Sequence, residues 1–173
     1  MPASPDPMIA ALIRELDLKP LPGEGGLYAE IYRSAGVIPA GAVAGRDQGP
    51  RNCSTAIYYL VTPEGFSSLH RVASTEIFHF YLGDPVRMLQ IAPDGRGARI
   101  TIGTDILAGQ RPQVVAPRGV WQGTRLLPGG RFALLGCTVA PGFDPADYEQ
   151  GDRAALTALC PDLAGEIAAL TYA

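Results

Sequence analysis

The residues of this chain that are best suited to chemistry lie together between Gly65 and Gly83. This stretch contains both histidines of the chain, His70 and His79, with Glu76 between them. An imidazole beside a carboxylate can act as an acid–base pair, because the carboxylate fixes the tautomer of the ring and stabilises the imidazolium that forms on protonation. Such a pair suits the removal of a proton from a carbon next to a carbonyl group.

The segment around Glu76 has the pattern of a β-strand that ends at the turn Gly83-Asp84-Pro85. Alternate residues of a strand point to the same face, so Glu76 shares a face with Phe78, whereas His79 and Tyr81 lie on the other. A carboxylate on an inward face among aromatic side chains is costly unless it has a partner or a function. The pattern therefore predicts a functional role for Glu76.

Several further segments have strand patterns separated by turns rich in Gly and Pro, which indicates an all-β sandwich or barrel. These segments are Leu27–Arg33, Cys53–Val61, Val86–Ile91, Ala98–Ile102, Gln113–Ala116 and Arg131–Val139. Helices are predicted at both ends of the chain, after the capping pair Asp6-Pro7 and over Asp152–Leu159 and Pro161–Leu170. We expect a single domain over residues 1–173, with a flexible N-terminus at residues 1–7 and with the helices on the outside.

The composition excludes several classes of partner. Hydrophobic residues make up 47% of the 173 residues and charged residues 18%, as in a folded globular domain. The net charge of −3 and the absence of any basic run argue against nucleic acid or an anionic membrane as a partner. No apolar run is long enough to span a bilayer, and no signal peptide is visible. The three cysteines stand far apart, which is typical of reduced thiols in a cytoplasmic protein.

The central stretch resembles the first motif of the cupin superfamily, in which a glycine, a His-x-His pair, a glutamate and a closing glycine follow one another. The matching residues are Gly65, His70, Glu76 and Gly83. The segment Pro117-Arg118-Gly119-Val120-Trp121-Gln122 is similar to the second motif, Pro-x-Gly-x-x-His. Val72 and Gln122 stand where these motifs have their second and third histidines.

A closer resemblance is to the uncharacterised DUF985 (cupin_5) group, which is described as sugar-epimerase-like. It rests on four segments in order: His70-Arg71-Val72, Glu76–Phe80, Gly83-Asp84-Pro85 and Gly136–Asp144. The resemblance implies a cupin-type double-stranded β-helix, also called a jelly-roll barrel, in which the two motifs face each other across the interior. It would bring His70, Glu76 and Gln122 together.

On this basis we expect His70 to act as the base and Glu76 to orient it. The resemblance implies a tyrosine as the opposite acid, for which Tyr59 and Tyr81 are the candidates. The expected contacts to a ligand are Ser68, Gln113 and Gln122 through hydrogen bonds, Phe78 and Trp121 as an apolar wall, and His79. Gln122 and Trp121 are equally explained as structural residues, and His79 is better explained as a hydrogen-bonded packing or interface residue.

Three functions remain open. The first is a metal-independent epimerase or isomerase that acts on a sugar or sugar derivative and needs no cofactor. The second is a binding protein for a small polar ligand, without catalysis. The third is a metal-dependent cupin whose divalent ion would be held by His70, Glu76, His79 and Gln122. Cupin metal sites use three histidines and a glutamate, which suit Fe, Mn, Ni or Zn, and Val72 cannot coordinate a metal.

The resemblance also implies a homodimer that forms through edge strands, and the exposed pattern of Leu27–Arg33 fits such pairing. Light scattering at micromolar concentration is expected to give twice the mass of the chain. A monomeric mass would contradict this prediction.

Overall fold

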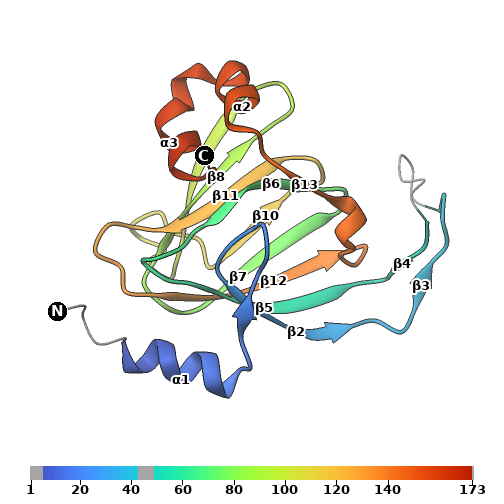
Figure 1. Ribbon diagram of the computed structural model, residues 1–173, viewed down its shortest axis with the longest axis horizontal. Coiled ribbons are helices and arrows are strands. Elements are labelled where there is room, and N and C mark those ends of the chain that lie inside the picture. Colours follow the sequence, from blue (N-terminus) through green and yellow to red (C-terminus); the bar gives the residue numbers. More distant parts are fainter. Residues whose placement is uncertain (1–5, 43–48, 173) are drawn as a thin grey trace.

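The structure is a computed structural model that describes residues 6–42 and 49–172. Two antiparallel β-sheets face each other, and helices from the two ends of the chain lie against their outer surfaces (Figure 1). This confirms the all-β sandwich or barrel that the strand patterns predict and the jelly-roll architecture that the family resemblance implies. Residues 1–5 of the N-terminal segment that was expected to be flexible lie outside the described residues, whereas Asp6 and Pro7 begin a helix.

The larger sheet has six strands in the order β1-β2-β5-β12-β7-β10. Their bounds are β1 Lys19–Pro20, β2 Leu27–Arg33, β5 Thr55–Val61, β12 Ala133–Ala140, β7 Thr75–Gly83 and β10 Gln113–Ala116. The second sheet has five strands in the order β13-β6-β11-β8-β9. Their bounds are β13 Tyr148–Gln150, β6 Ser67–Val72, β11 Trp121–Leu126, β8 Val86–Ile91 and β9 Gly97–Ile102. A separate pair joins β3 Val37–Ile38 to β4 Arg51–Asn52.

The main core lies between the two sheets and follows the alternation of the strands. Its buried members include Val61 on β5, Phe78 on β7, Met88 on β8 and Leu135 on β12. Burial of such side chains removes apolar surface from water and is the main force that holds the two layers together.

The helix α1, Pro7–Glu15, covers the outer face of the larger sheet. The Asp6 carboxylate caps it by accepting a hydrogen bond from the Met8 amide at 2.9 Å. Its apolar face packs on a cluster formed by Leu18, Leu60, Phe132 and Leu134. Leu60 and Leu134 alternate with residues that face the interior, so β5 and β12 are packed on both faces.

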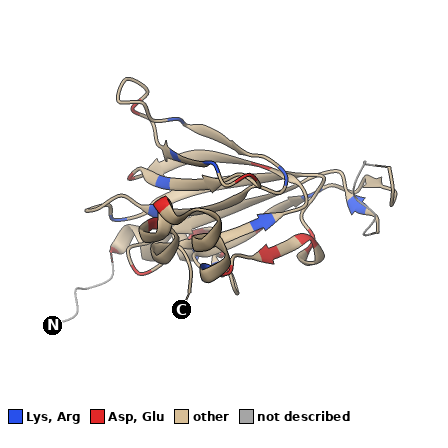
Figure 2. Ribbon diagram, turned by 90° about the horizontal axis from the view of Figure 1, so that it is seen from above, with Lys and Arg blue, Asp and Glu red and all other residues tan. Residues whose placement is uncertain are grey.

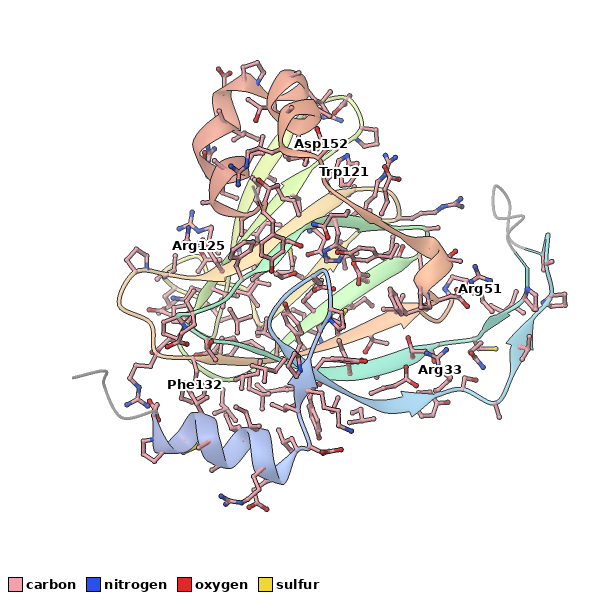
Figure 3. All side chains as sticks on the ribbon, viewed as in Figure 1. Arg33, Arg51, Trp121, Arg125, Phe132 and Asp152 are labelled. Atoms are coloured by element: carbon pink, nitrogen blue, oxygen red, sulfur yellow. The ribbon has the colours of Figure 1, made fainter. Side chains whose placement is uncertain are left out.

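The C-terminal helices α2, Arg153–Leu159, and α3, Ala164–Ala169, cover the outer face of the five-stranded sheet. A 3₁₀ turn, η2 at Pro161–Leu163, precedes α3, so the single helix predicted over Pro161–Leu170 is divided in two. Trp121 lies beneath these helices (Figure 3), in a buried cluster with residues such as Leu69 and Ile167. No helix within the described residues is long and apolar enough to cross a membrane.

The charged residues are dispersed over the fold, with Lys and Arg interspersed among Asp and Glu (Figure 2). Most of the ion pairs are exposed and contribute little to stability. The pair between Arg51 and Asp147 is different, because both side chains are buried. Arg51 Nε and Nη2 donate to the two carboxylate oxygens of Asp147, each at 2.8 Å. This pair fastens β4 to the 3₁₀ turn η1, Pro145–Asp147.

Substitution of one partner should leave the other charge buried without compensation. We expect Asp147→Asn to destabilise the fold by about 3–5 kcal/mol, which corresponds to a fall in Tm of about 2–4 °C for each kcal/mol. Arg96→Met removes an exposed pair with Asp94 and serves as the control with an unchanged Tm. The double variant Arg51→Met/Asp147→Leu should recover part of the loss in a calorimetric melt. An Asp147→Asn protein as stable as the wild type would contradict this reading.

Candidate functional site

A cavity of about 310 Å³ lies between the sheets, at the end of the barrel near η1. Its walls come from β2, β5, β7 and β12, from the loop before β2, and from the segment around η1 and β13. The lining residues are Leu21, Pro22, Glu24, Tyr28, Glu30, Thr55, Ile57, Tyr59, Glu76, Phe78, Cys137, Val139, Phe143, Pro145 and Tyr148. The volume is at the lower end of the range for sites that bind small molecules.

Glu76 is the buried carboxylate of this wall. It points inward from β7 together with Phe78, as the strand alternation predicts, and its side chain is 8% exposed. Its Oε2 accepts a hydrogen bond from Gln122 Nε2 at 3.0 Å, and the Cys137 thiol lies 3.6 Å from its Oε1. Burial raises the pKa of Glu76 above its ordinary value, because the charged form loses hydration.

His70 and Gln122 are directly opposite each other on the paired strands β6 and β11. Gln122 Nε2 lies 2.8 Å from His70 Nε2, and His70 Nδ1 lies 2.8 Å from the Ser68 carbonyl oxygen. A carbonyl only accepts, so Nδ1 carries the proton, and Nε2 accepts from the amide. In this tautomer one amide group donates to both His70 and Glu76.

His70 itself is 1% exposed and does not belong to the described residues that line the cavity. The cavity-facing member of the predicted acid–base pair is Glu76, and the imidazole lies behind it. The cause is the position of Tyr148, which lines the cavity and stacks on His70 with ring centroids 5.0 Å apart. Burial raises the pKa of Tyr148 to about 12.

Glu24 is a second cavity carboxylate that the sequence analysis missed. Its Oε2 lies 3.7 Å from His70 Nε2, and its Oε1 accepts a hydrogen bond from Ser67 Oγ at 2.8 Å. Burial opposes a charge on His70, but the carboxylates of Glu24 and Glu76 outweigh it and raise the pKa of the imidazole. The available signal was a lone acid within the glycine-rich segment Pro22–Gly26, which allows close approach to a site.

Tyr59 ties this loop to the cavity wall. Its hydroxyl donates to the Gly25 carbonyl at 2.9 Å, and its ring lines the cavity from β5. Gly26 has a φ of +68°, and a Cβ there would lie 2.6 Å from the Tyr59 hydroxyl oxygen. Only glycine fits both constraints. Burial raises the pKa of Tyr59 well above 10.

Three of the predicted site residues lie on the outer face of the larger sheet. His79 Nε2 lies 3.2 Å from Thr138 Oγ1, and Gln113 Nε2 lies 3.0 Å from His79 Nδ1. Tyr81 is 48% exposed and stacks near His79, over Gly136. The alternation of β7 that points Glu76 inward necessarily turns His79 and Tyr81 outward. The structure therefore separates them from the cavity.

Two other predicted contacts are buried elsewhere. Trp121 faces the C-terminal helices, and the Arg71 guanidinium lies 4.4 Å from its ring centroid. Ser68 Oγ donates to the Gly23 carbonyl and accepts from Gln150 Nε2. Of the predicted ligand contacts only Phe78 lies in the described wall of the cavity; Gln122 reaches the cavity through Glu76.

The residues present do not fit a metal held by three histidines and a glutamate. Val72 has no donor atom, His79 faces outward, and Gln122 presents its NH₂ group to His70 and Glu76. Within the described part of the chain, no group of three or more His, Cys, Asp or Glu side chains is arranged to hold a metal ion.

Two facing antiparallel sheets with an enclosed site are the architecture of a jelly-roll barrel, and comparison with known proteins places the chain among the cupins. Residues 10–151 match the family described as "Cupin superfamily (DUF985)", and the chain belongs to this family. It is 30% identical over 157 residues to an uncharacterized protein of Saccharomyces cerevisiae, covering 85% of this chain and 78% of that protein.

Solved structures agree with this assignment. A hypothetical protein from Leishmania major is 30% identical, with a TM-score of 0.85, over 95% of this chain and 98% of that one. A dTDP sugar isomerase from Desulfovibrio desulfuricans is 19% identical, with a TM-score of 0.52, over 80% of this chain and 94% of that one. This second likeness shows the fold alone.

The raised pKa of Glu76 has a consequence for stability. The folded state favours the protonated acid, so the contribution of this group is complete at low pH and is lost as the pH rises through its folded pKa. The raised pKa of His70 acts in the same direction. We expect Glu76→Gln to make the fall of Tm between about pH 5 and about pH 8 shallower than in the wild type.

Scanning fluorimetry over this pH range checks the prediction. Glu64→Gln, at an exposed position of the turn before β6, is the matched control and should follow the wild-type curve. A Glu76→Gln curve parallel to the wild type would show that Glu76 titrates alike in the folded and unfolded chains.

Proposed function

We propose that this protein binds a small carbohydrate-like molecule in the cavity and catalyses its epimerisation or isomerisation by proton transfer, without a metal ion. The observation that carries the proposal is the position of Glu76, a buried carboxylate in the cavity wall that Gln122 and His70 hold from behind. A base acts best when its pKa lies near the working pH, and burial moves the pKa of Glu76 in that direction.

In the proposed reaction Glu76 accepts the proton of a carbon next to the substrate carbonyl. The electron pair of the broken C–H bond moves to form the enolate, and its oxygen becomes negative. Return of the proton from Glu76 to the neighbouring carbon gives the isomer. Protonation of the first carbon on its other face by Tyr59 gives the epimer; Glu76 then releases its proton to solvent, and Tyr59 takes one up from solvent. Gln122 stabilises the ionised form of Glu76 through its hydrogen bond to Oε2. His70 acts as a positioning residue, because it accepts from the same amide.

Tyr59 is the proposed acid partner of Glu76, and both side chains face the cavity from the six-stranded sheet. Its ring lines the cavity, and Gly25 and Gly26 fix its hydroxyl. Burial raises its pKa, so the hydroxyl carries its proton and can stabilise an enolate by donating a hydrogen bond. The apolar side chains Ile57, Phe78 and Phe143 can exclude water and pack against the ring of a sugar.

The fold likeness to a dTDP sugar isomerase supports carbohydrate chemistry only at the level of the fold. A binding protein without catalysis is the second candidate, because the side chains that line the cavity could contact a ligand without taking part in a reaction. The two candidates differ in a single measurable property, which is exchange of a substrate hydrogen with solvent.

We expect the wild-type protein in D₂O to incorporate deuterium next to the carbonyl of a sugar chosen from aldoses, ketoses, uronic acids and amino sugars. Glu76→Gln should lower the exchange rate by about 100-fold or more, because a general base contributes at least that factor. His79→Asn, a histidine on the outer face, is the matched control and should keep the wild-type rate. Mass spectrometry and NMR of the sugar measure the exchange.

The roles of His70 and Glu76 separate in the same assay. Loss of exchange in His70→Asn, together with retention in Glu76→Gln, would return the role of base to His70. A sugar that raises Tm but shows no exchange with the wild-type protein would support the binding function and reject catalysis.

A further inference from the structure

The cavity carries negative charge that its own wall does not neutralise. Three carboxylates line it, from Glu24, Glu30 and Glu76, and the described lining residues include neither Lys nor Arg. A cavity with this lining attracts cations and repels anions, and its low-dielectric walls strengthen both effects.

One of the three carboxylates is neutralised from outside the cavity. Arg33 Nε and Nη2 donate to the two oxygens of Glu30 at 2.9 and 2.6 Å. The neighbouring guanidinium of Arg51 is turned to Asp147 at 2.8 Å, with Asp144 at 4.0 Å. The nearby arginines are thus engaged with other carboxylates, and the charge that faces the cavity comes from Glu24 and Glu76.

These two carboxylates converge on one point. Their Oε2 atoms lie 3.7 and 4.0 Å from the same atom, His70 Nε2. Burial lowers the pKa of His70, but the two carboxylates outweigh it and raise that pKa, and one imidazolium can balance only one of the two carboxylates. The ordinary partner for the carboxylate that remains is a cationic donor.

The rest of the wall suits the body of such a cation. Tyr28, Tyr59, Phe78, Phe143 and Tyr148 line the cavity. The faces of aromatic rings carry negative potential and attract ammonium groups, most strongly where water is excluded. Carboxylates and aromatic faces therefore act in the same direction, from different elements of the fold.

We propose that the ligand of this cavity is a small organic cation, of which an amino sugar is the class that also fits the proposed reaction. Its ammonium group binds Glu24, which leaves Glu76 for proton transfer. Phosphorylated sugars, nucleotide sugars and sugar acids are excluded by repulsion. The proposal rests on the proposed function only in placing the ligand in this cavity, and it holds for a binding protein equally.

The test compares sugars that share a scaffold but are cationic, neutral or anionic, such as glucosamine, N-acetylglucosamine and glucuronate. Other amino sugars and simple amines are added to the set, and each compound is used at millimolar concentration. We expect at least one amine to raise the Tm of the wild-type protein, and its neutral and anionic counterparts to raise it less or not at all. Glu24→Gln should weaken binding of that amine by about tenfold or more, because a charge-assisted hydrogen bond is lost.

Two variants control this result. Glu149→Gln, an exposed carboxylate paired with Arg71, should leave the affinity for the amine unchanged. Glu24→Asp keeps the charge and should keep the preference for the amine over its N-acetyl form, even at reduced affinity. The Tm of each variant without ligand reports whether it folds.

Stabilisation by the anionic or neutral members alone, no stabilisation by any amine, or a Glu24→Gln protein that binds the amine as the wild type does would overturn the proposal. None of these results depends on turnover. Hydrogen exchange on a neutral sugar would leave the proposed function standing while the inference on charge fails. Binding of an amine without hydrogen exchange would support the inference on charge and reject the proposed catalytic function.

Discussion

The amide nitrogen of Gln122 donates to His70 and Glu76 at the same time, and the buried charges of the site depend on this arrangement. A histidine at position 122 would add a third lone-pair donor to those of His70 and Glu76, and three such donors are the usual ligands of a metal ion. The amide instead supplies two protons, so it occupies the place of a cation between two acceptors. Its own oxygen is buried and has no hydrogen-bond partner within the described part of the chain, so this arrangement carries a desolvation cost.

This interaction also decides which group meets a ligand. Because the amide holds His70 against the Ser68 carbonyl, and Tyr148 covers its ring, the imidazole can influence the cavity only through its neighbours. The carboxylates of Glu24 and Glu76 are the groups that a ligand would touch. The described wall of the cavity contains the carboxylates of Glu24, Glu30 and Glu76 and includes neither Lys nor Arg.

The sequence was informative where a local rule applied. The alternation of β7 predicted the inward direction of Glu76 and Phe78, and the motif resemblance brought His70, Glu76 and Gln122 together correctly. It failed where tertiary contacts decide. Glu24 reaches the site through a loop whose course depends on its contact with Tyr59, and Tyr148 arrives from a strand of three residues with no recognisable pattern. Trp121 could not be assigned from sequence, because its orientation depends on helices more than thirty residues later in the chain.

The two-sided packing of β5 gives the N-terminal helix a part in the site that it never touches. Tyr59 lines the cavity, and the adjacent Leu60 lies under α1, so the helix braces the cavity wall from behind. Without the packing of α1 on Leu60, β5 would be more mobile and the width of the cavity would vary. A shortened chain that begins after α1 would keep every polar group of the site but bind its ligand more weakly. Binding would then have to order a mobile cavity wall, and the lost conformational entropy lowers the affinity.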